Sequence, residues 1–257
     1  IEELSKLDKE KLDNVKEDIK TRLEETHGRV TPAMLEQEVR ALENSLSIKR
    51  LMEGIESDGN EVLYLSCDVR CDEDLKRTIE QAVGKNGPVN ILIHGAGIEK
   101  SRLLSQKKRE EFREVFSVKA EGMCNLYRLL DLKELKAAFA FSSISGRFGN
   151  EAQIDYCSAN SFLSSFMAMV RAKHKHIYAL SIAWSGWKDL GIAWRNEYVR
   201  NHSEEMGLNL IEPSRGTAEF INILTGNLET REIIVSKGLT RFTGEKMSRR
   251  VYNDKPM

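Results

Sequence analysis

Apolar residues recur every three to five positions along the first part of the chain, and this spacing predicts helices. In the first stretch they are Ile1, Leu4, Leu7, Leu12, Val15, Ile19 and Leu23. His27-Gly28 predicts the end of this helix, because glycine tolerates the left-handed conformation that closes one. Thr31-Pro32 predicts the start of a second helix, with Thr as N-cap and Pro at the first helical position. The second apolar set is Leu35, Val39, Leu42, Leu46, Leu51 and Ile55.

Residues 1–58 are also highly charged, with 15 acidic and 10 basic side chains. A narrow apolar stripe between charged faces favours a solvated helical hairpin that buries one side of each helix. A helix pair that binds a partner is the alternative.

After Asp58-Gly59-Asn60 the pattern changes to short apolar runs that alternate with helical segments. The predicted strands are Glu61–Ser66, Val89–His94, Ala137–Ser142, Ile177–Ala183 and Glu232–Ser236. The predicted helices cover residues 72–84, 106–131, 154–173, 192–206 and 213–225. Strands separated by helices predict an α/β domain with a parallel sheet. The polar, basic segment from Arg241 to Met257 is typical of a linker.

Composition narrows the functional classes. The 257 residues carry 39 Lys and Arg against 40 Asp and Glu, so no basic surplus points to nucleic acid or to a membrane surface. Cys67 and Cys71 are four apart rather than in a CxxC pair, and His174, His176 and His202 lack acidic partners at ligand spacing, so no metal is expected. No apolar run approaches 18 residues and no signal peptide opens the chain. We interpret the chain as cytoplasmic.

The segment from Phe141 to Asn160 carries the most informative chemistry. A predicted strand ends in Ser142-Ser143, a glycine-containing loop follows, and Tyr156 lies near the start of a helix. Tyr156 and Asn160 are four apart and share one helix face. Parallel sheets place ligands at strand ends, so a hydroxyl and a phenol can converge there on one substrate oxygen. Spacing alone leaves open a structural reading, because Ser and Gly mark many loops and Tyr is often half-buried with its hydroxyl bonded.

These residues resemble the short-chain dehydrogenases/reductases. Ser143 precedes Tyr156 by thirteen residues, as the catalytic Ser precedes the Tyr in that superfamily. Most members have Tyr-x-x-x-Lys, whereas this chain has Asn160 in place of that Lys and a lysine at position 119. This exchange is similar to the ketoreductase domains of modular polyketide synthases.

Three further segments, in the family's order, support the resemblance over about residues 59–240. They are Cys67-Asp68-Val69, His94-Gly95-Ala96-Gly97 and the run from Ser181 to Trp187. The charged hairpin and Val30–Met34 look closest to polyunsaturated-fatty-acid-type synthases, in which a charged helical insertion follows the second strand. The resemblance implies a Rossmann-like three-layer α/β/α fold with a doubly wound parallel sheet. We therefore expect a helical hairpin insertion at 1–58, the ketoreductase-like domain at 59–240 and a linker at 241–257.

The resemblance also implies a reaction, the NADPH-dependent reduction of a 3-ketoacyl thioester. Tyr156 would donate the proton, Ser143 would hydrogen-bond the carbonyl oxygen, Lys119 would favour the phenolate and hold the nicotinamide ribose, and Asn160 would anchor a water relay. The implied cofactor-binding residues are Asp68, Val69, His94, Gly95, Ala96, Gly97, Lys119, Tyr156, Ser185 and Gly186. The implied partners are an acyl carrier protein and neighbouring synthase domains, and a homodimer is compatible with the family. Trp184, Trp187 and Trp194 flank the implied lid and are candidates for acyl-chain contact.

One family feature is missing from the 257 residues, the glycine-rich phosphate loop with its flanking strands. In the doubly wound order 3-2-1-4-5-6 those are strands 1 and 2, so the predicted strand Glu61–Ser66 would have no neighbour. We expect either that the polypeptide continues upstream of Ile1 or that another segment or another chain fills the gap. The family's signatures of product stereochemistry are also absent, since Glu99-Lys100-Ser101 and Phe148 stand at their positions.

Two functional alternatives follow from this departure. A reductase-like domain without its phosphate loop can be a catalytically silent scaffold, and the helical hairpin can serve assembly. Catalysis is favoured over a silent scaffold because a scaffold has no need of all four residues of the family's catalytic set, which are Lys119, Ser143, Tyr156 and Asn160.

Overall fold

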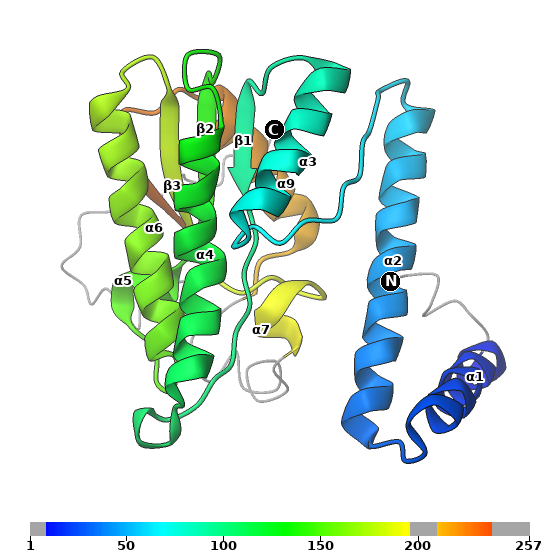
Figure 1. The fold of residues 1–257 in the computed structure, drawn as a ribbon. Helices are drawn as coiled ribbons and strands as arrows, with labels where there is room; N and C mark the ends of the chain where they lie inside the picture. The colour runs from blue at the N-terminus through cyan, green and yellow to red at the C-terminus, as the bar shows by residue number, and fades with distance from the viewer. Residues whose placement is uncertain (1–8, 196–209, 238–257) are drawn as a thin grey trace. The chain divides into compact units, whose positions relative to one another are not determined.

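The computed structural model describes residues 9–195 and 210–237, which are coloured in Figure 1. The chain divides into two compact units, Ile1–Leu65 and Ser66–Met257. The first is helical and the second contains the sheet, and we call them the helical unit and the sheet unit.

The helical unit consists of α1 (Lys9–His27) and α2 (Pro32–Ser57). Their ends confirm the predicted signals. Gly28 has a φ of +71°, and the Thr31 hydroxyl accepts a hydrogen bond from the Met34 amide at 3.3 Å. Ile19 and Leu23 of α1 are buried, whereas the predicted apolar stripe of α2 is half-buried except at Leu51, which is exposed. The predicted positions Ile1, Leu4 and Leu7 lie outside the described residues.

Within the described residues, the sheet unit has four parallel strands in the order β1-β2-β3-β4, which confirms the predicted parallel sheet. The strands are β1 (Ile91–His94), β2 (Ala137–Ser143), β3 (Tyr178–Trp184) and β4 (Glu232–Val235). The long helices are α3 (Asp72–Asn86), α4 (Arg109–Leu129), α6 (Ile154–Lys173) and α9 (Pro213–Thr225). The short ones are η1 (Leu104–Gln106), α5 (Ile144–Phe148) and α7 (Gly191–Arg195), of which η1 and α5 were not predicted as separate helices.

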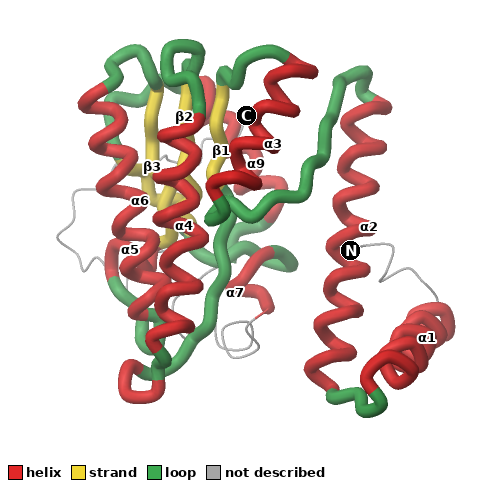
Figure 2. The backbone as a smooth tube through the Cα atoms, in the orientation of Figure 1, coloured by secondary structure: helices red, strands yellow, loops and turns green. Residues whose placement is uncertain are grey.

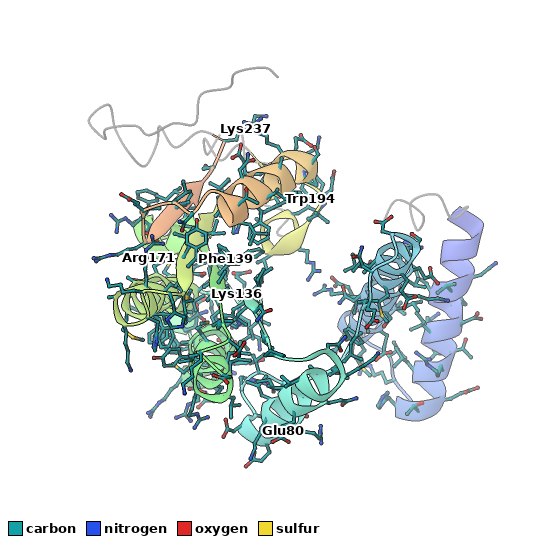
Figure 3. The ribbon with its side chains drawn as sticks, turned by 90° about the horizontal axis from the view of Figure 1, so that it is seen from above. Glu80, Lys136, Phe139, Arg171, Trp194 and Lys237 are labelled. Atoms are coloured by element: carbon teal, nitrogen blue, oxygen red, sulfur yellow. The ribbon has the colours of Figure 1, made fainter. Side chains whose placement is uncertain are left out.

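Helices cover both faces of this sheet, so the unit has three layers (Figure 1, Figure 3). Successive side chains of a strand point to opposite faces, and β2 shows this directly. Ala138 and Ala140 pack with Met123, Leu163 and Met167 of α4 and α6 on one face.

Phe139 of β2 packs on the other face, against Phe220 and Ile223 of α9. The two cores bury β2 and β3 between the layers, as their continuous apolar runs predict, whereas β4 is half-buried along its length.

The predicted strand Glu61–Ser66 is wrong, because the structure shows a loop there that belongs to no sheet (Figure 2). A strand needs a neighbour to satisfy its backbone groups, and among the described residues β1 pairs only with β2. Ile91 and Ile93 point to the opposite face of β1 from the buried Leu92 and His94 and are about half exposed, at 50 % and 46 %.

The predicted helix 192–206 is observed as α7 up to Arg195, and its remainder lies outside the described residues, as does the expected linker at 241–257. Trp184 and Trp187 pack against each other with ring centroids 4.9 Å apart and belong to the core under α9. No helix within the described ranges is long and apolar enough to span a lipid bilayer.

Candidate active site

The carboxyl ends of the parallel strands bring the candidate residues to one edge of the sheet. His94 ends β1, Ser143 ends β2 and Trp184 ends β3. Ser143 is also the N-cap of α5, and its hydroxyl accepts a hydrogen bond from the Ser145 amide at 3.2 Å. This bond fixes the hydroxyl at the point where the chain leaves the sheet, and α6 follows five residues after α5 ends.

Lys119 reaches this edge from α4 and is buried. Its ammonium donates a hydrogen bond to the Phe141 carbonyl oxygen at 2.8 Å. Burial lowers the pKa of Lys119 to about 8. Gly97 makes room for it, because a Cβ at that position would lie 2.8 Å from Lys119 Cε and 3.1 Å from Nζ.

Tyr156 enters the site from the first turn of α6, and Lys119 Nζ lies 5.9 Å from the centroid of its ring. Burial raises the pKa of the Tyr156 phenol, and the nearby side chains of Asn160 and Ser143 act in the opposite direction. The net shift is upward. The site thus brings the Tyr156 side chain near the Ser143 side chain and near the Lys119 ammonium.

Asn160 lies one turn further along α6 and is completely buried. Its Nδ2 donates to the Tyr156 carbonyl oxygen at 2.8 Å, while Oδ1 has no hydrogen-bond partner. The Asn160 carbonyl oxygen accepts bonds from Ser142 and Ser164, and α5 packs directly on the residue at Gly146. A buried acceptor without a partner is costly, so Asn160 Oδ1 is suited to a bound water or ligand.

Two other predicted cofactor-binding residues, His94 and Val69, pack against α4 close to Lys119. His94 Nε2 lies 3.0 Å from the Lys119 carbonyl oxygen, and burial, with a smaller contribution from the Lys119 charge, lowers the pKa of His94 to about 4. Val69 packs so closely on Gly122 that a Cβ there would lie 2.8 Å from Val69 Cγ2.

Asp68 precedes Val69 and forms an ion pair with Arg70 at 2.7 Å. Hydrogen bonds from Arg70 lower the pKa of Asp68 to about 2. Both side chains remain partly exposed, at 44 % and 39 %.

The end of β3 carries two more polar atoms without partners, Trp184 Nε1 and Ser185 Oγ, both buried. Gly186 follows, and its missing side chain is needed because a Cβ would lie 2.7 Å from Leu210 Cδ2. Ser185 Oγ at the end of β3 and Asn160 Oδ1 on α6 are buried polar atoms that still lack a partner. A hydroxyl and an amide oxygen of this kind suit the polar groups at the nicotinamide end of a dinucleotide.

The structure brings Lys119, Ser143, Tyr156 and Asn160 together from α4, β2 and α6, and their roles remain predictions. Sequence reasoning missed Lys107 and Asp155, which form a buried ion pair at 2.7 Å next to Tyr156. Asp155 stands beside the predicted tyrosine, but nothing in the run from Gln106 to Arg109 indicates which lysine is buried.

Comparison with known proteins identifies the family that the chain resembles. The model of the KR domain family matches residues 39–189, and the match begins within α2. A polyunsaturated fatty acid synthase protein of Thraustochytrium is 28 % identical over 211 residues, which are 82 % of this chain and 7 % of that protein. The polyketide synthase PksN of Bacillus subtilis is 28 % identical over 195 residues, 74 % of this chain and 4 % of that protein.

A solved structure is similar as well, the ketoreductase domain from the bacillaene assembly line. It superposes with a TM-score of 0.67 at 28 % identity, over 75 % of this chain and 47 % of that chain. The similarity confirms the Rossmann-like α/β fold. The chain spans less than a tenth of the curated relatives it matches and about half of the solved domain.

Proposed function

The chain belongs to the KR domain family, and from this membership we propose that it reduces a 3-ketoacyl thioester to the 3-hydroxyacyl thioester with NADPH. The observation that carries the proposal is the convergence of Lys119, Ser143, Tyr156 and Asn160 on one end of the sheet. A carbonyl that is reduced develops negative charge on oxygen, so it needs a proton donor and oriented dipoles at that atom.

The side chains can meet those needs. Tyr156 holds the proton that passes to the carbonyl oxygen, since its raised pKa keeps the phenol protonated before reaction. Ser143 donates a hydrogen bond to the same oxygen. The Lys119 ammonium stabilises the phenolate that remains, and Asn160 Oδ1 holds a water that returns a proton to it.

NADPH would supply the hydride when bound. Lys119 and the Ser185 hydroxyl are the groups placed to hold its ribose and nicotinamide, and Asp68 and Val69 are the predicted contacts of the adenine. The residues from His94 to Gly97 would line the cofactor between them. The ketoacyl group would arrive on an acyl carrier protein, with other synthase domains as neighbours.

The pyrophosphate needs a further element. The 257 residues contain no glycine-rich strand-to-helix turn, so we expect turnover to require such a segment from outside them. The test therefore compares the 257-residue chain with a longer polypeptide that contains it together with a phosphate-binding strand–loop–helix.

The assay follows NADPH oxidation with a 3-ketoacyl thioester of a small carrier mimic. Tyr156→Phe should lower kcat by about 10²- to 10⁴-fold, because it removes the general acid. Tyr127→Phe is the matched control, since Tyr127 is a half-buried tyrosine of α4 whose hydroxyl lies 2.9 Å from His174 Nε2. Unchanged turnover in Tyr156→Phe would overturn the proposal.

A catalytically silent scaffold is the second candidate, and the missing glycine-rich loop is the observation that favours it. If the domain is such a scaffold, the longer polypeptide should keep its fold but should neither bind NADPH nor reduce the substrate. Deleting residues 1–57 then tests the assembly role of the hairpin, because a change in oligomeric mass without a change in activity would assign it to assembly.

A further inference from the structure

A buried ion pair joins the loop before α4 to the start of α6. Lys107 Nζ lies 2.7 Å from Asp155 Oδ2, and the two side chains are only 3 % and 1 % exposed. By contrast, the pair Arg128–Asp72 on the same unit is exposed at 59 % and 47 %. Lys107 and Asp155 are thus two ionisable groups that are shielded from water next to the candidate site.

The position of Asp155 connects this pair to Tyr156. Asp155 lies in the first turn of α6, immediately before Tyr156, and its Oδ1 accepts a hydrogen bond from the Tyr156 amide at 2.9 Å. Its other oxygen is the one that Lys107 binds. The Lys107 ammonium also donates to the Lys100 carbonyl oxygen, so one cation links the loop backbone to the helix that carries the phenol.

Further hydrogen bonds tie the same two segments together. The Arg102 amide donates to the Ala152 carbonyl oxygen at 2.7 Å. Gln153 Nε2 donates to Glu99 Oε1 at 3.2 Å and to Ser101 Oγ at 3.1 Å. Residues 99–107 therefore form a clasp over residues 152–155, and we use "clasp" for these two segments.

Stability alone is a weak reason for such a pair. Removing two charges from water offsets most of their attraction, and well-packed apolar residues in their place are often as stable or more so. An ion pair also constrains geometry, because its hydrogen bonds fix the position of each partner. Near a reacting atom that matters, since a displacement of about 1 Å can cost about 100-fold in rate.

We propose that Lys107 and Asp155 are positioning residues, which hold the first turn of α6 so that the Tyr156 hydroxyl faces Ser143. This inference rests on the proposed function. Neither side chain needs to touch the substrate or the cofactor. The Asp155 carboxylate connects residues 99–107 to the turn of α6 that carries the phenol, and through it the clasp limits the movement of that turn.

The first experiment separates positioning from stability. Lys107→Met leaves Asp155 buried and unpaired, and we expect both the melting temperature and kcat to fall. The double variant Lys107→Met with Asp155→Leu replaces both charges by apolar groups. It should recover the melting temperature while kcat stays about 10- to 100-fold below wild type. Recovery of kcat together with the melting temperature would overturn the proposal.

Two milder variants keep the test decisive if the double variant fails to fold. Asp155→Asn keeps the shape and one acceptor but removes the charge, and it should lower kcat while KM for NADPH changes by less than about twofold. Lys107→Arg keeps the charge and should retain most of the activity. Lys108→Met is the matched control, because the neighbouring lysine is exposed. Equal kcat values in Asp155→Asn and in wild type would contradict the proposal.

A readout without cofactor distinguishes this inference from the proposed function. Amide hydrogen exchange of the 257-residue chain should be faster at Tyr156 and its neighbours in Asp155→Asn, with α3 and α9 unchanged. If exchange at Tyr156 is unaffected, the positioning role fails whatever the activity. If exchange responds but Tyr156→Phe remains active, the proposed function fails and the clasp survives as a local structural tie.

Discussion

The helical unit and the sheet unit place their charged residues differently. In the helical unit the ion pair that joins α1 to α2, Arg22–Glu38 at 3.3 Å, is exposed at 66 % and 41 %. In the sheet unit Lys107, Lys119 and Asp155 have buried side chains. Exposed pairs add little to stability, and buried charges cost desolvation. The sheet unit therefore carries the desolvation cost of buried charges that are held by fixed hydrogen bonds, whereas the helical unit keeps this ion pair in contact with water, where it costs little.

The two units also differ in apolar burial. The sheet unit has fully buried side chains on both faces of β2 and β3, while α2 has none among the side chains that the structure describes. The helical unit should therefore be the less stable of the two, and the predictions below use this difference.

The largest effect is expected from a cavity in the sheet unit. Leu163→Ala should lower the free energy of unfolding by about 3 to 5 kcal/mol, because Leu163 is fully buried between α6 and the sheet. Leu42→Ala, at a half-buried position of α2, should cost about 1 kcal/mol.

Denaturant unfolding can follow the units separately, since all 3 tryptophans lie in the sheet unit. Tryptophan fluorescence should report the loss in Leu163→Ala and should not move in Leu42→Ala, which should shift only the circular dichroism transition. If Leu42→Ala shifts both signals equally, the two units unfold as one.

Acid should weaken the sheet unit through His94. The unfolded imidazole takes up a proton near pH 6.5, whereas the buried side chain does so only near pH 4. The unfolded state therefore binds more protons between these values, and the free energy of unfolding falls as the pH falls, by up to about 3 kcal/mol. His94→Gln should remove that loss, and the exposed His176→Gln should leave it unchanged. Unfolding curves at pH 7 and pH 4 measure the difference.

A smaller effect is expected at Gly97, where the backbone approaches Lys119. The Cβ of Gly97→Ala would press on Lys119 Cε and Nζ and displace the ammonium, so kcat should fall by about 10- to 100-fold with little change in stability. Gly84→Ala on α3 is the control, since nothing lies within 4 Å of its added Cβ, and it should be stabilising by about 0.5 to 1 kcal/mol. Full activity in Gly97→Ala would show that Lys119 can shift without consequence.

The smallest effect concerns the cap of α2. Thr31→Ala removes the acceptor of the Met34 amide and should destabilise the helical unit by about 1 kcal/mol, seen by circular dichroism. Thr21→Ala, in the middle of α1, should be neutral or slightly stabilising because alanine is the better helix former. Equal losses in the two variants would mean that the cap contributes nothing.

Much of the fold could be predicted because local signals were strong. The apolar runs that became β2 and β3 lie between helical segments and are buried on both faces, so their pattern depends little on distant contacts. Glu61–Ser66 has the same local pattern and forms no strand, since a strand also needs a neighbour. The cap of α5 by Ser143 was missed because five residues give too short a period to detect.

The sequence by itself determined the long helices, the helix ends at Gly28 and Thr31, the parallel sheet, and the candidate set of Lys119, Ser143, Tyr156 and Asn160. Each of these rests on spacing along the chain or on a motif of fixed length. Only the tertiary structure decided which charged groups are buried, that Gly97 borders Lys119 and that Lys107 reaches Asp155 across 48 residues of sequence. Burial and hydrogen bonding depend on which helices and strands are in contact. The packing of the layers decides those contacts, and local periodicity does not.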